Sequence, residues 1–146
     1  MATDTTSDAA QIRQLIDHWV KALHAKDING LMAHHATDIL LFDAVPPLQY
    51  KGAEAYRNNW ERCFPCFQGP IGCEIRELSI TAGDDVAFSH SLNQIRGTTT
   101  TGENFATWLR VTVCYRKLDG QWTVTHEHVS VPFDPESGRA SVDLKP

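Results

Sequence analysis

The chain has 146 residues, of which 42% are hydrophobic and 21% charged, and its formal charge at pH 7 is −5. This balance is typical of one globular domain and excludes a disordered chain. The negative charge argues against nucleic acid or an anionic membrane as the main partner. The first residues lack the features of a signal peptide, and no apolar run is long enough to cross a bilayer. We therefore expect a cytoplasmic protein whose four cysteines are reduced.

The N-terminal segment predicts two helices. Asp8 and Gln11 have capping-box spacing ahead of the first helix. The apolar stripe of this helix recurs at steps of three and four residues and consists of Ile12, Leu15, Ile16, Trp19 and Leu23. Asp27 is placed to cap a shorter second helix.

A strand and a third helix follow. The apolar run 39–42 fits a buried strand that ends at Asp43. Residues 52–64 carry a helical stripe of apolar side chains. Pro65 stops this helix, because the residue before a proline is pushed out of the helical region.

From Ile71 onward the hydrophobic period changes to two, and this pattern predicts strands at 71–81, 85–96, 104–117 and 121–131. Asp119-Gly120 is a hairpin-turn signal, and Pro132 ends the last strand. Helices followed by an antiparallel meander predict a single α+β domain, with a core over 8–133 and a tail over 134–146. In it, a curved antiparallel or mixed sheet would wrap around three helices and leave a cavity between the two layers.

The last two strands carry polar side chains that are unusual in a plain core. His126 and His128 share one face of the strand 121–131, and Glu127 lies on the other face. Arg110 lies between apolar residues in the preceding strand, so it needs a partner if it is buried. That partner is either a carboxylate or phosphate of a ligand, or the internal carboxylate of Asp43 or Glu127.

The hairpin turn leaves two strand registers open. A two-residue turn pairs Arg110 with Val129, whereas a three-residue loop pairs Arg110 with His128. The register decides whether the histidines line a pocket, where they would titrate near neutral pH, or a subunit interface. A half-buried histidine that is hydrogen-bonded to the backbone is the alternative for at least one of them.

Asp43 and several aromatic residues are further candidates. Burial against a pocket would raise the pKa of Asp43 and suit it to act as a base, whereas the alternative is a turn-capping aspartate. The aromatic set could line an apolar cavity or simply fill the core, because the spacing is the same for both. This set consists of Trp19, Tyr56, Trp60, Phe64 and Trp108.

No motif predicts a metal or a cofactor. His126, His128 and His90 could form a three-histidine site, but no local spacing fixes the third ligand. Cys63 and Cys66 form a lone C-x-x-C, and core packing is the better interpretation of Cys63. A glycine-rich phosphate loop, a nucleophile elbow and a dinucleotide fingerprint are all absent from the sequence.

The order of elements and four segments together resemble a known superfamily. These segments are 19–31, 37–43, 50–56 and the closing strand 119–130 with its sequence DGQWTVTHEHVS. They resemble the nuclear transport factor 2-like superfamily, and within it SnoaL-like and ketosteroid-isomerase-like proteins. The closing strand is also similar to the association domain of calcium/calmodulin-dependent protein kinase type II. The resemblance implies a cone-shaped, cystatin-like α+β barrel with a deep pocket, which forms a homodimer through the outside of its sheet.

The resemblance also implies roles for individual residues. Asp43 falls where ketosteroid isomerases keep their general base, and Trp19 falls where they keep a tyrosine that holds the enolate oxygen. Arg110 falls where the kinase association domain has a pocket arginine, and His90 lies near another such position. The candidate catalytic residues are therefore Asp43, His90, Arg110 and His128. The candidate binding residues are Trp19, Tyr56, Trp60, Trp108 and His126.

Two functions remain open at this stage. One is an isomerase, cyclase or lyase that uses Asp43 as its base. The other is a non-catalytic ligand-binding or oligomerisation module with an anion site at Arg110. In both, the partner would be a small organic molecule that bears a carboxylate or a carbonyl group.

Overall fold

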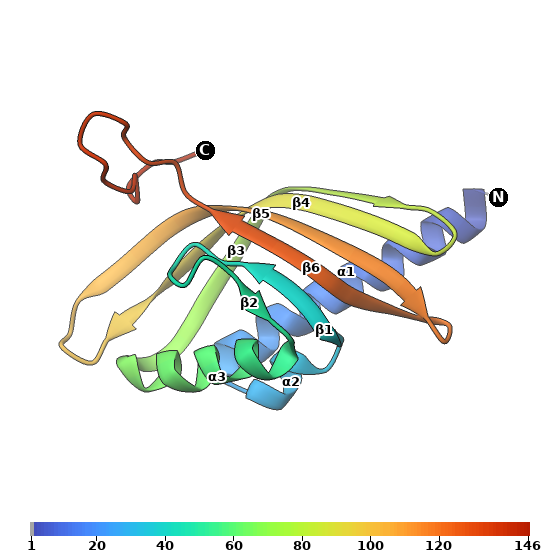
Figure 1. Ribbon diagram of the computed structural model, residues 1–146, viewed down its shortest axis with the longest axis horizontal. Coiled ribbons are helices and arrows are strands. Elements are labelled where there is room, and N and C mark those ends of the chain that lie inside the picture. Colours follow the sequence, from blue (N-terminus) through green and yellow to red (C-terminus); the bar gives the residue numbers. More distant parts are fainter. Residues whose placement is uncertain (1) are drawn as a thin grey trace.

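The computed structural model describes the backbone of residues 2–146 and the side chains from Ser7 onward. Its helices are α1 (Ala2–Ala25), α2 (Ile28–Met32), α3 (Ala53–Cys63) and the 3₁₀ turn η1 (Phe64–Cys66). Its strands are β1 (His35–Phe42), β2 (Tyr50–Lys51), β3 (Phe67–Ala82), β4 (Val86–Thr99), β5 (Asn104–Leu118) and β6 (Gln121–Ser130). The predicted α+β class is confirmed (Figure 1).

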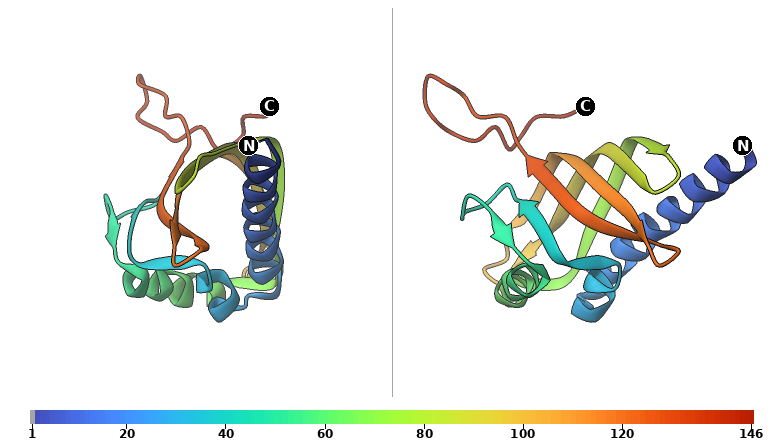
Figure 2. Two further views of the ribbon diagram at one scale, coloured as in Figure 1. Left: turned by 90° about the vertical axis from the view of Figure 1, so that its right-hand side faces the viewer. Right: turned by 45° about the vertical axis from the view of Figure 1, so that its right-hand side comes forward.

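The six strands form one sheet in the order β2-β1-β6-β5-β4-β3. The pair β1–β6 is parallel and the other pairs are antiparallel, so the sheet is mixed. The sheet curves strongly, and α1 runs along its concave side against β3 (Figure 2). The sheet stays open, with β2 and β3 as its two edges, and does not close into a barrel.

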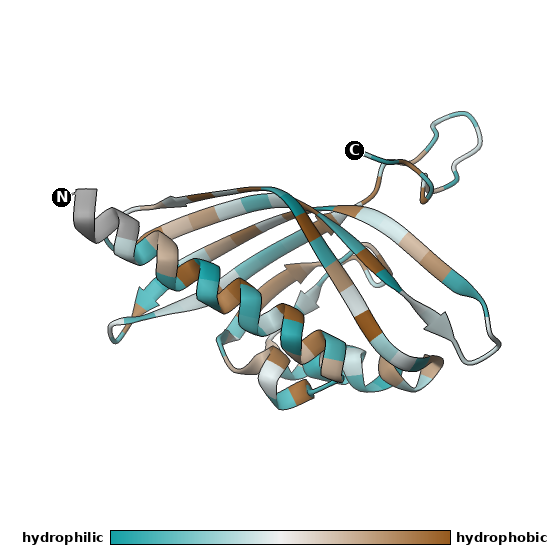
Figure 3. Cartoon of the chain, turned by 180° about the vertical axis from the view of Figure 1, so that it is seen from behind, coloured by the Kyte–Doolittle hydropathy of each residue, from teal (hydrophilic) through white to brown (hydrophobic). Residues whose placement is uncertain are grey.

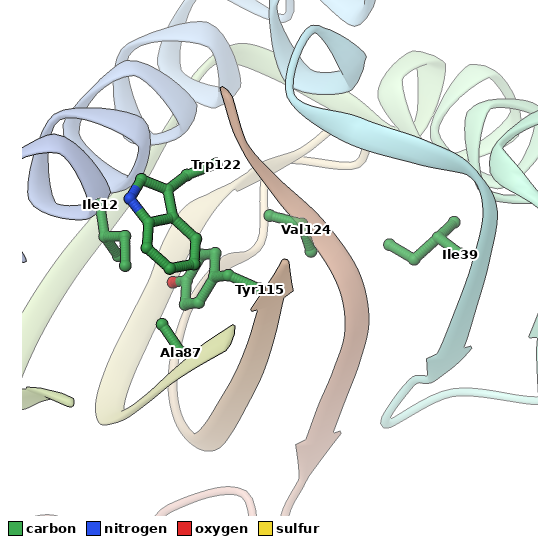
Figure 4. Close-up of a cluster of buried hydrophobic side chains, with 6 residues drawn as sticks. All are labelled: Ile12, Ile39, Ala87, Tyr115, Trp122 and Val124. Carbon is green, nitrogen blue, oxygen red and sulfur yellow. The ribbon is translucent and has the colours of Figure 1, made fainter. Parts of the chain in front are cut away.

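The stripe predicted on α1 is buried where α1 meets the sheet. Ile12 and Leu23 are completely inaccessible to solvent. Ile12 contacts a cluster from β1, β4, β5 and β6 in which Trp122 and Tyr115 are the largest side chains (Figure 4). The exposed residues of α1 are mainly hydrophilic. Figure 3 shows hydrophilic and hydrophobic residues alternating in bands along this helix. Burial of this stripe fixes α1 across the open side of the sheet.

The predicted start of α1 is wrong. The helix begins at Ala2, so Asp8 lies inside it and is not an N-cap. The Asp8 carboxylate instead accepts hydrogen bonds from Lys117 Nζ at 2.9 Å and from Trp122 Nε1 at 3.0 Å. Asp8 therefore ties α1 to the hairpin of β5 and β6, and long-range contacts, not helix capping, account for this residue.

The other boundaries differ from the prediction by a few residues. Asp27 does cap α2, since its carboxylate accepts from the Gly30 N–H at 3.1 Å. Strand β3 begins at Phe67, which is four residues earlier than predicted, so part of the expected loop pairs with β4. The two-residue strand β2 was not predicted because a strand so short has no periodicity. After β6 the chain leaves the sheet and forms a loop. An isolated β-bridge between Phe133 and Ala140 closes this loop.

A β-bulge between β5 and β6 sets which side chains face the interior. Asp119 and Gly120 both have positive φ and form a two-residue turn, so Leu118 pairs with Gln121. Further along, Cys114 pairs with His126 but Tyr115 pairs with Val124, which leaves Thr125 unpaired. Both registers predicted for Arg110 are therefore wrong.

The bulge shifts Arg110 into register with Ser130 and Thr112 into register with His128. On a regular strand, Val124 and Glu127 would face opposite sides of the sheet, because they are three positions apart. Both are buried, since the bulge lies between them. His126 and His128 accordingly lie on the outer face of the sheet.

Candidate functional site

The interior between the helices and the concave face of the sheet contains two adjoining chambers. The first chamber has about 60 Å³ of space for water centres, and its walls include Leu15, Ile16, His35, Ser91, Val113 and Tyr115. The second chamber has about 80 Å³, and its walls include Leu41, Asp43, Tyr56, Trp60, Ile95 and Leu109. The first chamber has room for roughly four to six water molecules and the second for roughly five to eight.

Four side chains line both chambers and thus mark the junction between them. They are Trp19, Asn93, Val111 and Glu127. Asn93 and Glu127 are buried polar residues, and Trp19 comes from the stripe of α1. Polar groups that are shielded from water in this way act strongly on a ligand because the local dielectric constant is low.

Two carboxyl groups face the second chamber. Burial raises the pKa of Glu127 to about 7, and the nearby charge of Asp43 acts in the same direction. The Tyr56 hydroxyl donates to Glu127 Oε2 at 3.3 Å and partly opposes this shift. Burial also raises the pKa of Asp43, against the effect of the Ala44 N–H. Two carboxyl groups whose environments shift their pKa values differently suit the roles of a proton acceptor and a proton donor.

Asp43 has features of both predicted environments, the turn cap and the pocket wall. One carboxylate oxygen accepts from the Ala44 N–H at 2.7 Å, as a turn-capping aspartate does. The same side chain lines the second chamber and also borders an open groove that His128 and Leu48 line from outside. Asp43 therefore lies between the interior and solvent.

Two buried donors near the carboxyl groups have no partner among the described residues. The indole Nε1 atoms of Trp19 and Trp60 are buried and make no hydrogen bond to the described residues. Asn93 accepts from the Ser91 hydroxyl at 2.7 Å through its Oδ1, which leaves its amide nitrogen for a ligand. A buried donor without a partner is costly, so these groups favour a bound molecule or water that accepts from them.

His35 supplies one more open polar atom in the first chamber. Its Nδ1 is buried and has no partner among the described residues. Burial lowers the pKa of His35 to about 4, so the ring is neutral at pH 7. Ser89 and Tyr115, which also line this chamber, satisfy one another at 2.8 Å.

The predicted site residues divide between the two faces of the sheet. Asp43, Trp19, Tyr56 and Trp60 line the chambers. The other five candidates lie on the outer face of the sheet, because side chains alternate along a strand and Val111 and Glu127 face inward. They are His90, Trp108, Arg110, His126 and His128.

These outer residues have contacts of their own. Arg110 donates from Nε to the Ser130 hydroxyl at 3.1 Å, and within residues 7–146 it makes no ion pair. The predicted internal pairing of Arg110 with Asp43 or Glu127 is therefore wrong. Arg110 borders a shallow groove together with His90.

The remaining outer residues form aromatic contacts. His126 bonds through Nδ1 to the Leu40 carbonyl at 2.7 Å. The rings of His126 and His128 lie edge-on to Phe42, at centroid distances of 4.8 and 5.4 Å. The Arg76 guanidinium lies 5.0 Å from the centre of the Trp108 ring.

Glu127, Asn93 and His35 line the interior but were not among the sequence candidates for catalysis or binding. Glu127 was placed opposite the histidines but not assigned to the pocket, because the bulge that turns it inward leaves no sequence signal. Asn93 could have been found, since it is a polar residue on the alternating face of β4 that also carries Ser89 and Ser91.

Two further properties concern membranes and metals. Within residues 2–146, no helix combines the length and the apolar character that a bilayer crossing needs. Across the same residues, no three histidine, cysteine, aspartate or glutamate side chains come together as a metal site would need.

Comparison with known proteins connects this geometry to relatives. Residues 12–134 match the model of the SnoaL-like domain. An NTF2-like protein of unknown function from Pseudomonas putida KT2440 shares 41% identity over 97% of this chain and 99% of its own, with a TM-score of 0.89. No curated protein is significantly similar.

Two more distant structures share the fold. One is a protein of unknown function with a cystatin-like fold from Nostoc punctiforme, with 22% identity over 97% of this chain and 98% of its own and a TM-score of 0.73. The other is a ketosteroid isomerase-like protein from Erwinia carotovora atroseptica, with 21% identity over 84% of this chain and 95% of its own and a TM-score of 0.72.

Proposed function

Because this chain belongs to the SnoaL-like domain family, we propose that it is an enzyme of the isomerase, cyclase or lyase type that moves protons on a small molecule in its interior. The observation that carries the proposal is the pair of buried Glu127 and half-buried Asp43 beside buried indole N–H donors that have no partner among the described residues. A core that serves only packing does not need these groups, and leaving them unpaired lowers stability.

Asp43 is the base in this proposal. It removes a proton from the carbon next to a carbonyl group; the electron pair of that C–H bond forms a C=C bond, and the π pair of the carbonyl group moves onto its oxygen. The indole N–H of Trp19 and the amide of Asn93 donate to this oxygen as its charge develops. Each such donor is typically worth about 10²–10³ in rate.

Glu127 completes the proton transfer. With a pKa of about 7 it is protonated in a large fraction of molecules at neutral pH. It can give its proton to another carbon of the ligand, which results in isomerisation, or to a leaving oxygen, which results in elimination. Asp43 then loses its proton to Glu127 or through the open groove to solvent.

Hydrogen exchange into simple ketones tests the base. Cyclohexanone and 1-tetralone are incubated with the protein in D₂O, and the loss of their α-proton signals is followed by NMR. We expect wild-type protein to accelerate exchange, and Asp43→Asn to lose this acceleration. Asp38→Asn, which changes an exposed aspartate of β1, is the matched control and should exchange like wild type. Exchange by Asp43→Asn at the wild-type rate would contradict the assignment.

The outer face of the sheet supports a second candidate function at a separate place. Arg110 lies there beside His90 without a carboxylate partner among the described residues, which suits a weak anion site or a contact between two copies of the chain. A homodimer through this face would bury the aromatic cluster around Phe42. Static light scattering tests for the dimer, and thermal shifts with small carboxylates on wild type and Arg110→Ala test for the anion site.

A further inference from the structure

The C-x-x-C at the end of α3 has no part in the proton transfer described above, yet its two thiols lie close together. Asn59, Cys63 and Cys66 follow one another at steps of four and three residues, so they share one side of α3 and of the turn η1. Cys63 is half-buried, Cys66 is exposed, and both are free thiols. A reagent in solvent can therefore reach Cys66 and then find a second thiol one helical turn away.

The backbone holds the two cysteines at a separation that suits a disulfide. It stays helical at Cys63 (φ −78°, ψ −40°) and at Phe64 (φ −57°, ψ −41°). Residues three apart on an α-helix or a 3₁₀-helix have Cα atoms roughly 5–6 Å apart. A disulfide usually spans about 4.4–6.8 Å between Cα atoms. A bond between Cys63 and Cys66 therefore requires rotation of side chains but no rearrangement of the backbone.

Each thiol now donates to an acceptor one turn back along the chain. Cys63 Sγ lies 3.8 Å from Asn59 Oδ1, and Cys66 Sγ lies 3.7 Å from the Arg62 carbonyl oxygen. Both contacts are weak, because a thiol is a weak donor. Formation of a disulfide removes both S–H groups, so Asn59 Oδ1 loses one of the two groups that donate to it.

Asn59 connects the cysteines to the segment 43–49, which joins β1 to β2 and begins at the proposed base. Asn59 is buried, and its Oδ1 lies 3.0 Å from the Tyr50 hydroxyl oxygen. The same hydroxyl oxygen lies 3.0 Å from the Pro46 carbonyl oxygen. A hydroxyl group has one proton, so Tyr50 donates to one of these two oxygens at a time. Once Asn59 has lost the thiol, it draws the Tyr50 proton away from Pro46.

We propose that Cys63 and Cys66 form a reversible dithiol–disulfide site, and that closure of the disulfide loosens the segment 43–49. The oxidant is a low-molecular-weight disulfide, with glutathione disulfide as the probe. This thiol chemistry takes place on the outside of α3 and is independent of the function proposed for the interior.

The oxidation takes place in two displacement steps. The Cys66 thiolate attacks one sulfur of glutathione disulfide, the S–S bond of that molecule breaks, and one glutathione leaves as a thiolate. The Cys63 thiolate then attacks the Cys66 sulfur, and the second glutathione leaves. The two protons of the protein thiols pass to the two glutathione thiolates, so the protein loses two electrons and the glutathione disulfide gains them. Burial raises the pKa of the Cys63 thiol, which slows the second step.

Thiol counting after redox equilibration tests the disulfide. The full chain is incubated with glutathione at increasing fractions of the disulfide form, quenched with acid, alkylated and weighed by mass spectrometry. We expect the number of alkylated cysteines to fall from four to two, and to return to four in excess reduced glutathione. Cys66→Ser should keep all its remaining thiols. Cys73→Ser and Cys114→Ser, the matched controls, should still lose two thiols on oxidation.

Cleavage by chymotrypsin tests the coupling to the segment 43–49. Leu48 in this segment is 92% exposed, and Leu118, in the hairpin at the opposite end of β6, is 41% exposed. We expect oxidation to speed cleavage after Leu48 about fivefold, which is the effect of losing roughly one net hydrogen bond. Cleavage after Leu118 should not change. Tyr50→Phe lacks the hydroxyl group, so it should be cleaved at the faster rate in both redox states.

Three results would overturn the inference. One is four free thiols in the wild-type protein at every ratio of glutathione disulfide to glutathione. Another is a stable glutathione adduct on Cys66 without an internal disulfide. The third is equal cleavage after Leu48 in the oxidised and the reduced protein. All three are measured on wild-type protein, so they hold even where a variant fails to fold.

Discussion

The protonation of Glu127 should make the stability of the fold depend on pH in a defined direction. The pKa of this carboxyl group is about 7 in the folded protein and 4.5 when it is free in water. The folded state therefore binds the proton more tightly than the unfolded state does. The stability that this proton contributes is fully present below pH 4.5, and it is lost as the pH rises through 7.

The magnitude follows from the two pKa values. A difference between 4.5 and about 7, at about 1.4 kcal/mol per pH unit, corresponds to roughly 3 kcal/mol of unfolding free energy. Glu127→Gln keeps the shape of the side chain but carries no charge at any pH. We expect this variant to have about the same stability as wild type near pH 4.5 and to be more stable by up to roughly 3 kcal/mol above pH 8.

Urea unfolding of both proteins at intervals from pH 4.5 to 8.5 measures this difference. The comparison isolates Glu127 because all other titrating groups are common to both proteins. In thermal unfolding the same effect would raise the Tm of the variant by roughly 10 °C at high pH, at about 2–4 °C per kcal/mol for a chain of this length. Parallel stability curves for the two proteins would refute the reasoning, since Glu127 would then be ionised in the folded state at an ordinary pKa.

Three further predictions concern single side chains. Asp8→Asn should lower the Tm at pH 7, because it removes the carboxylate charge that holds Lys117. Since the hydrogen bonds from Lys117 and Trp122 lower the pKa of Asp8, thermal scans should show the difference vanish as the pH falls through that lowered pKa, below 3.8. Gly120→Ala should cost about 1–2 kcal/mol in urea unfolding, because Gly120 has a φ of 77°, and an unchanged midpoint would argue against the two-residue turn. Trp19→Phe should slow ketone exchange by about 10²–10³ with little change in stability; an equal rate would remove the indole from the proposed site.

Much of the fold could be predicted from the sequence because the hydrophobic period is a local property. The stripe from Ile12 to Leu23 indicated α1, and the change to a period of two after Ile71 indicated the meander of β3 to β6. The resemblance to SnoaL-like proteins, carried by residues such as 119–130, is confirmed by the family match. These features depend on neighbouring residues and not on distant contacts.

The candidate site was less predictable because it depends on which face of the sheet each residue occupies. For Asp43 and the aromatic residues of α1 and α3 the sequence left a pocket wall and a turn or core position open, and these residues line the second chamber. The outer positions of Arg110 and His128 depend on a bulge halfway along the hairpin. Neither the turn nor the alternation of residues contains a signal for that bulge. The catalytic and binding roles of all these residues remain predictions.

The unpaired Thr125 has a consequence for comparing sequences of this fold. In a strand that paired every residue after the turn, His126 would face inward and Glu127 outward, so the chamber would hold an imidazole in place of an acid. A relative one residue shorter at this point could keep the acid inside without any bulge. An alignment that omits this extra residue therefore assigns every later position of β6 to the opposite side of the sheet, and it exchanges the chemistry of the interior with that of the surface.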